Sequence, residues 1–368
     1  MVSGLEDVVA AETSLSDVDG QSGRLIIRGQ SLDELVKHAT YEGVLTLLWE
    51  GFFKELPPAS DMPMLLGTAR QKVFKHFEAA DAEILQQPTV GAVRALIARL
   101  PDADDIESAL LLVAAPAVFT PGILRLQRKL APIAPNGKLG HAADMLRMLS
   151  GETPTQEQAS ALDRYLVTVS DHGLNASTFA ARVVASTRAG LTSATLAALS
   201  ALKGPLHGGA PGPVLDALDS IDSPEHASTW LQDALDRGER LMGFGHRVYR
   251  VRDPRADALK EALKRLTQSG QVDAKRLQLA ESVETAALDL LARKKPNRPL
   301  QTNVEFYTAL LLEALGIPRE AFTCVFAAGR SGGWIAHARE QAVNGRLIRP
   351  QSRYIGPTPH QPQQDAAA

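Results

Sequence analysis

Cysteine, net charge and long apolar runs are all scarce in this chain of 368 residues. The single cysteine, Cys324, excludes an internal disulfide and gives no sign of a secreted, disulfide-rich scaffold. Its apolar setting, Phe-Thr-Cys-Val-Phe, favours inert packing over a role as a nucleophile. The formal charge of −3 at pH 7 offers no bulk basic surface, so we expect no nucleic-acid partner.

Targeting signals and several common enzyme motifs are missing as well. The acidic N-terminus lacks the apolar core of a signal peptide, and we find no apolar run long enough to cross a bilayer. The sequence has no phosphate-binding P-loop, and its histidines lack the spacing of metal ligands. We therefore expect a cytoplasmic protein with no membrane partner, no metal and no redox cofactor.

Helical signals dominate what remains. Ser31–Glu34 and Thr155–Gln158 are capping boxes at the start of helical patterns, and strand signals are confined to the first 30 residues, around Arg24–Arg28. The four prolines of Pro116–Pro135 predict a loop with a short helix inside it. We expect an all-α fold with a small N-terminal β excursion, and the length suggests two domains.

Two stretches place one histidine each among glycines: Gly204–Pro213 around His207, and Leu241–Arg250 around His246. Glycine lets the backbone approach a ligand closely. Prolines after His207 are suited to open a helix, whose positive end would keep that ring neutral. Arginines after His246 offer anion-binding forks. Either stretch alone is equally well read as an ordinary turn with a surface histidine.

Four further side chains stand out. Glu305 is expected at a loop-to-helix junction, where it is either a first-turn residue favoured by the helix dipole or a base aimed into a cleft. Arg330 lies in an otherwise apolar, small-residue helix, and a buried arginine needs a partner such as a substrate carboxylate. His337 on the same helix favours a structural role, and Arg349 is equally readable as a solvated charge.

In order and at their separations, five motifs resemble the citrate synthase family: HGGAPGPV, GFGHRVYRVRDPRA, NVEFY, FAAGRSGGWIAH and IRPQSRYIG. The resemblance runs from about Gly4 to Gly356, nearly the whole chain. It is similar in particular to the short bacterial citrate/2-methylcitrate synthase branch.

This resemblance implies an all-α homodimer, with a large domain of residues 1–207 and 311–368 and a small inserted domain of residues 208–310. It implies a transferase of the tricarboxylic acid cycle that condenses acetyl-CoA with oxaloacetate to citrate and CoA through citryl-CoA. The coenzyme A thioester is then a substrate, and no cofactor is implied.

The resemblance also implies roles for single residues. His207 would hydrogen-bond the thioester oxygen, Glu305 would remove a methyl proton, and His246 would polarise and protonate the ketone of oxaloacetate. The residues matched to dicarboxylate binding are His172, Arg255, Arg330 and, from the partner subunit, Arg349. Gly243, Gly245 and Arg250 match the coenzyme A edge, where Lys295 or Arg298 would add phosphate contacts.

Two departures from the commoner family pattern leave turnover and acyl preference open. Glu305 stands where aspartate is usual, and Ala210–Pro213 replaces the usual Ala-Asn-Glu after HGG. A 2-methylcitrate synthase that uses propionyl-CoA remains an alternative, because one methyl group changes selectivity by only about 1–3 kcal/mol. A catalytically weak homologue that binds coenzyme A or dicarboxylates is the alternative outside catalysis.

Overall fold

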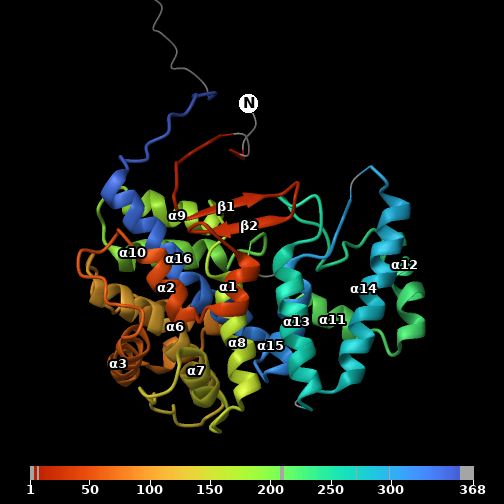
Figure 1. The fold of residues 1–368 in the computed structure, drawn as a ribbon, viewed down its shortest axis with the longest axis horizontal. Helices are drawn as coiled ribbons and strands as arrows, with labels where there is room; N and C mark the ends of the chain where they lie inside the picture. The colour runs from red at the N-terminus through yellow and green to blue at the C-terminus, as the bar shows by residue number, and fades with distance from the viewer. Residues whose placement is uncertain (1–3, 6–7, 208–210, 271, 298, 357–368) are drawn as a thin grey trace, which may run out of the picture.

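The computed structural model describes residues 4–5, 8–207, 211–270, 272–297 and 299–356. Helices make up most of this part of the chain, and one small antiparallel sheet of order β1-β2-β3 lies near the N-terminus. Figure 1 shows that sheet lying across one end of a layered helical body. The expected all-α fold with a small N-terminal β excursion is confirmed.

The β1–β2 hairpin forms around an aspartate-capped turn. Its strands are Ser16–Asp19 (β1) and Arg24–Ile27 (β2), followed by Gln30–Ser31 (β3). The carboxylate of Asp19 accepts the N–H groups of Gln21 and Ser22, as aspartate does in turns. Gly23 closes the turn with φ of +68°. This geometry pairs Ser16 with Ile27 and fixes the register of the hairpin.

The main helical body is built from the first ten helices and the last one. These helices are α1 (Leu32–His38), α2 (Tyr41–Trp49), α3 (Met62–Phe74), α4 (Ala82–Leu85), α5 (Thr89–Ile97), α6 (Ile106–Gln127), α7 (His141–Ser150), α8 (Gln156–Val169), α9 (Ala176–Ala185), α10 (Leu191–Leu202) and α16 (Phe322–Asn344). Short 3₁₀ turns cover Lys75–Ala79, Pro224–His226 and Arg319–Ala321.

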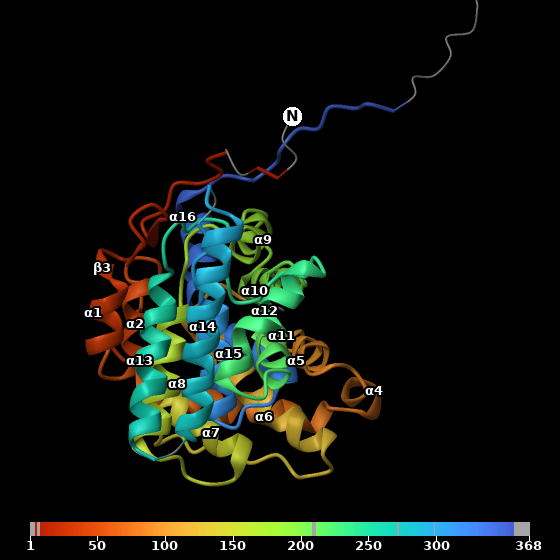
Figure 2. The ribbon, with the colours of Figure 1, turned by 90° about the vertical axis from the view of Figure 1, so that its right-hand side faces the viewer.

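The remaining helices are α11 (Pro211–Asp219), α12 (Ala227–Asp236), α13 (Pro254–Gln268), α14 (Ala274–Lys294) and α15 (Val304–Ala314). Helices α11, α12 and α14 lie together at the side of the molecule that is on the right in Figure 1 and faces the viewer in Figure 2. Helices α13 and α15 adjoin α8. The expected domain boundary at residue 208 lies outside the described residues, and the division into 1–207, 208–310 and 311–368 stays a prediction.

Helix α16 is the centre of the body, packed against α2, α5, α6, α8, α9 and α10. Two of its glycines allow this approach. A Cβ on Gly329 would lie 2.4 Å from a methyl group of Val169, and a Cβ on Gly333 would lie 2.2 Å from the carbonyl oxygen of Ser170. Contacts this short do not occur for real Cβ atoms, so α16 presses directly on the segment that leads to His172.

Helix α6 corrects the expectation for Pro116–Pro135. The helix runs unbroken through Pro116 and Pro121, and most of its side chains are buried. An interior proline costs about 3 kcal/mol, and burial of an almost wholly apolar helix offsets that cost. By length and composition α6 is also one helix that could span a membrane, contrary to our expectation, and 89% of its apolar window is buried inside the protein.

Candidate active site

The glycine turn before His246 is paired with the segment that leads into α15. Gly243 and Gly245 have φ of +86° and +81°, which other residues rarely adopt. The N–H of Gly245 donates to the carbonyl of Gln301 at 2.7 Å, and the N–H of Asn303 donates to the carbonyl of Gly243 at 2.9 Å. Two motifs that are far apart in the sequence therefore form one unit.

His246 is held as a neutral ring by its own loop. Its Nδ1 accepts the backbone N–H groups of Val248 at 3.0 Å and Tyr249 at 3.1 Å, so the proton is on Nε2. Burial, and then the charge of Arg255, lower its pKa to about 4. The Nε2 atom lies 3.3 Å from Nη2 of Arg255. These two neighbouring donors can share one acceptor that lies beside both, such as a ligand oxygen.

His172 lies against the same loop from the α8–α9 turn. Its Nε2 is 3.1 Å from the hydroxyl of Tyr249, and its ring centroid is 5.6 Å from that of His246. Burial, and then the charges of Arg255 and Arg330, hold the pKa of His172 well below its usual value. The structure thus brings together two neutral imidazoles and two arginines.

Arg255 is anchored at the start of α13 by Asp253. The carboxylate of Asp253 accepts Nε of Arg255 at 3.0 Å and Nη2 at 2.7 Å. It also accepts the backbone N–H of Val304, the first residue of α15, at 3.2 Å. This buried pair holds the guanidinium in one place and ties α13 to α15.

Arg330 is a buried guanidinium with spare donors. It is 1% exposed on α16. Its Nε donates to the carbonyl of Val169, while Nη2 is buried and has no hydrogen-bond partner among the described residues. Burial lowers its pKa to about 10, against the opposing charge of Asp171. A buried donor without a partner is costly, and an anionic ligand would satisfy it.

Glu305 sits in the first turn of α15, which Asn303 caps. Its Oε2 atom is buried and has no hydrogen-bond partner in the described part of the chain. Burial raises its pKa to about 7, with Asp253 adding to the rise and Arg255 and Arg330 opposing it. A carboxylate with this pKa can take a proton near neutral pH.

His207 is held by the first turn of α9. The backbone N–H of Ser177 points at its Nε2 from 3.3 Å, and the hydroxyl of Ser177 lies 2.8 Å from the same atom. Trp334 on α16 donates to that hydroxyl at 3.1 Å. Because Nε2 accepts a backbone N–H, the neutral ring carries its proton on Nδ1.

The expected reason for the neutrality of His207, the positive end of the helix that follows it, stays a prediction. Helix α11 begins at Pro211 as expected, but residues 208–210 between them lie outside the described residues. The helix whose N-terminus contacts the ring is α9, through Ser177. Burial, followed by the charge of Arg330, lowers the pKa of His207 to about 4.

The residues expected at the coenzyme A edge are more dispersed. Arg250 is exposed, and its charge contributes to the low pKa of His246. Lys295 is exposed at the C-cap of α14, and Arg349 is exposed beyond the end of α16. Within the described ranges, no hydrogen bond or ion pair joins Lys295 or Arg349 to the histidines. Arg298 lies outside the described residues.

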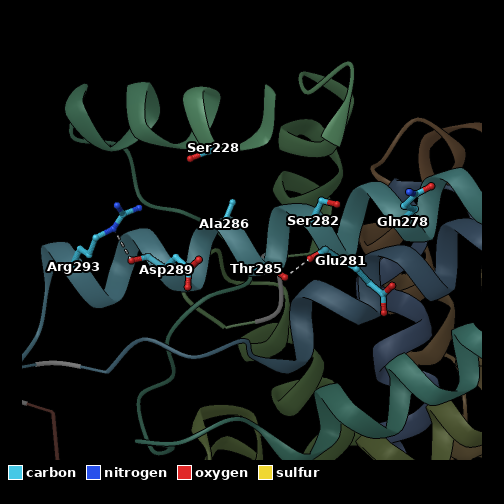
Figure 3. Close-up of a pocket in the computed structure, with 8 residues that line it drawn as sticks. All are labelled: Ser228, Gln278, Glu281, Ser282, Thr285, Ala286, Asp289 and Arg293. Carbon is cyan, nitrogen blue, oxygen red and sulfur yellow. Dashed lines mark hydrogen bonds between the residues drawn. The ribbon is translucent and has the colours of Figure 1, made fainter. Parts of the chain in front are cut away.

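A separate groove of about 510 Å³ lies between α12 and α14 (Figure 3). Its polar groups are partly engaged within α14, where Thr285 donates to the carbonyl of Glu281 and Arg293 to that of Asp289. None of the predicted site residues lines it. The lining residues are Ser228, Gln278, Glu281, Ser282, Thr285, Ala286, Asp289 and Arg293.

Sequence reasoning missed four residues of the site. Ser177 contacts His207, Tyr249 contacts His172, and Asp253 binds Arg255. Tyr165 on α8 is fully buried, and the charge of Glu305 contributes to raising its pKa. Tyr249 and Asp253 lie within the motif GFGHRVYRVRDPRA and could have been predicted from it. Ser177 and Tyr165 are brought to the site only by the fold.

Comparison with known proteins identifies the family. Residues 4–351 match the family model "Citrate synthase, C-terminal domain". The chain is 37% identical to citrate synthase of Haloferax volcanii (96% of this chain, 95% of that one) and 35% identical to 2-methylcitrate synthase of Mycobacterium tuberculosis (96% and 90%). It also resembles the solved complex of carboxymethyl coenzyme A and oxaloacetate with citrate synthase of Thermoplasma acidophilum, with a TM-score of 0.83, 28% identity and 97% of each chain covered.

The helical fold and the family match over residues 4–351 define a transferase. The chain belongs to the citrate synthase family, whose members condense acetyl-CoA with oxaloacetate. It is therefore a transferase of citrate synthase type, as the motifs predicted.

Proposed function

We propose that this protein condenses acetyl-CoA with oxaloacetate to give citrate and CoA, with Glu305, His207 and His246 as its catalytic residues. The observation that carries the proposal is that Glu305 and Arg330 each bury a polar atom without a partner among the described residues, beside two imidazoles whose hydrogen bonds define where their protons lie. No metal or redox cofactor enters this reaction.

In the first step, Glu305 removes a proton from the methyl group of acetyl-CoA. An unaided carboxylate is far too weak a base for this, so the developing enolate oxygen needs a donor. The N–H on Nδ1 of His207 supplies it, because Ser177 occupies the other nitrogen. A neutral donor keeps its proton while it stabilises the charge.

In the second step, the nucleophilic carbon attacks the ketone carbon of oxaloacetate. The N–H on Nε2 of His246 hydrogen-bonds the ketone oxygen and gives its proton to the alkoxide that forms. His172, Arg255 and Arg330 hold the two carboxylates, which fixes the ketone for attack. Water then adds to the thioester of citryl-CoA, and CoA leaves as the thiol.

The acyl preference is the finer part of the proposal. The relative named 2-methylcitrate synthase makes propionyl-CoA the second candidate substrate. We expect acetyl-CoA to be condensed with the higher kcat/KM, measured side by side with propionyl-CoA at saturating oxaloacetate. A higher kcat/KM for propionyl-CoA would assign the second function, and absence of condensation with both would refute the catalytic proposal.

A cytoplasmic homodimer completes the proposal. The segment after α16 leads away from the body in both views and exposes Leu347 and Ile355 by 58% and 86% (Figures 1 and 2). A neighbouring subunit would cover these side chains and receive Arg349 in its site. We expect sedimentation of the active protein to give twice the mass of the chain. An active monomer at assay concentration would contradict the role of Arg349.

A further inference from the structure

The N-terminal β1–β2 hairpin contacts the turn that carries His172. The hydroxyl of Ser16 on β1 donates to Oδ2 of Asp171 at 2.5 Å and accepts the backbone N–H of Gly173 at 2.8 Å. These two partners are the residues on either side of His172. One serine side chain therefore contacts the carboxylate of the residue before that imidazole and the backbone of the residue after it.

The tip of the same hairpin contacts the loop that carries His246. The carbonyl of Gly20 accepts the backbone N–H of Arg250 at 2.8 Å. A Cβ on Gly20 would lie 2.3 Å from the carbonyl oxygen of Val248, the residue whose own N–H holds Nδ1 of His246. The φ of Gly20 is outside the left-handed region, so this close approach is the only demand for glycine here.

The hairpin joins two turns that are otherwise linked only through side chains. His172 and His246 meet through their rings and through Tyr249, and no backbone hydrogen bond between residues 171–173 and 246–252 is present in the described structure. Both turns are instead bonded to strand β1 or to the turn that follows it. The relative position of the two rings therefore depends on an element more than 150 residues away in the sequence.

We propose that the β1–β2 hairpin positions the oxaloacetate site, with Ser16 as the positioning residue for His172 and Gly20 as the positioning residue for His246. The proposal rests on the roles that the proposed function gives to these two histidines. Neither hairpin residue is proposed to touch substrate. Gly20 acts through the backbone of the His246 loop, and Ser16 acts through the Asp171 carboxylate and the backbone N–H of Gly173.

The first test is Gly20→Ala, with Gln21→Ala as the control in the same turn. The new methyl group must move the His246 loop by about 1 Å to reach an ordinary contact distance, and displacement on this scale costs roughly 10²-fold in rate. We expect kcat at saturating oxaloacetate to fall by about that factor. The infrared carbonyl band of bound oxaloacetate should move towards its position in free solution, because the ketone is less polarised. Gln21→Ala should match the wild type in both.

The second test is Ser16→Ala, with Ser22→Ala as the control. Ser22 is a serine of the same hairpin whose hydroxyl bonds only within the turn, to Asp19. Loss of the two hydrogen bonds of Ser16 frees the His172 turn, and we expect the KM for oxaloacetate to rise about tenfold, with a smaller change in kcat. The thermal unfolding midpoint of all four variants reports any general loss of stability.

A hairpin that serves stability alone would lower the unfolding midpoint of Gly20→Ala and Ser16→Ala and leave their kcat, KM and carbonyl band at wild-type values. That result overturns the positioning proposal. A wild-type protein that condenses neither thioester would overturn the proposed function instead, and the wild-type assay alone reveals it.

Discussion

Glu305→Gln is expected to lower condensation by at least about 10²–10⁴-fold, the range typical of losing a general base. Glutamine keeps the size and hydrogen-bonding shape of the side chain but cannot accept the methyl proton. Oxaloacetate binding should survive, because the residues proposed to hold that substrate are Arg255, Arg330 and His172. The direct measurement is exchange of the acetyl-CoA methyl protons with solvent while a non-condensing oxaloacetate analogue is bound.

Undiminished exchange in Glu305→Gln would mean that another residue takes the proton. Glu305→Asp is the matched control, because it keeps the carboxylate and restores the residue more common in the family. It withdraws the charged group by more than about 1 Å, which costs roughly 10²-fold if the backbone is set for glutamate. An aspartate variant as fast as the wild type would mean that the reach of this side chain is not critical.

Glu305→Gln should also stabilise the protein at alkaline pH. Burial raises the pKa of Glu305 from 4.5 to about 7, so the folded state binds more protons than the unfolded state between these values. The stability that Glu305 contributes is therefore lost as the pH rises through this window, by on the order of 3 kcal/mol. Activity needs the carboxylate, so kcat/KM should rise over the same range.

Urea unfolding at pH 5 and pH 8 measures how the stability difference between Glu305→Gln and the wild type depends on pH. Glu305→Gln should unfold at higher urea concentration than the wild type at pH 8, and the difference should be smaller at pH 5. An equal difference at both pH values would show that the carboxylate is not held at a raised pKa.

Arg330→Met is expected to weaken oxaloacetate binding by at least about 30-fold. Methionine fills much of the volume of the side chain but removes the charge. Removing one partner of a buried, hydrogen-bonded charge pair costs about 2–5 kcal/mol, and Nη2 of Arg330 has no partner among the described residues that would compete with the substrate. Calorimetry of oxaloacetate binding without any acyl-CoA measures this loss of affinity directly.

Two further variants define what Arg330 provides. Arg330→Lys keeps the charge but loses the planar fork, and its affinity should fall between the two. Arg265→Met, at an exposed arginine paired with Glu261 on α13, should bind oxaloacetate as the wild type does. If Arg330→Met bound oxaloacetate normally, with an unchanged circular dichroism spectrum, the carboxylate would have to be held elsewhere.

Local signals predicted the helices well. The capping box at Thr155 is present with both of its hydrogen bonds, and the strand around Arg24–Arg28 forms β2. The prolines of α6 misled us, because a proline signal is local while the burial that outweighs it is a property of the whole body. Patterns of turn and cap residues therefore predict where elements begin more reliably than where they end.

The chemistry of the site was only partly predictable. Glycine-flanked histidines and a lone arginine in an apolar helix pointed to His207, His246 and Arg330. The position of the proton on His207 depends on its hydrogen bond with Ser177. This bond joins α9 to a turn that is distant in the sequence, so the spacing of residues does not predict it. Likewise, the role of Asp253 follows from the fold. Its carboxylate bonds both Arg255 on α13 and the backbone N–H of Val304 on α15, and these two helices lie side by side.

The central place of α16 bears on the order in which the molecule can be completed during synthesis. Ribosomes deliver a chain from its N-terminus at about 5–20 residues per second, and domains commonly fold as they emerge. Here the helix that six others pack against begins at Phe322, near the end of the chain. The faces of α2, α5, α6, α8, α9 and α10 that pack against α16 are therefore all synthesised before their partner. Among them is α6, an apolar helix of 22 residues, whose contact with α16 can form only after Phe322–Asn344 has been synthesised.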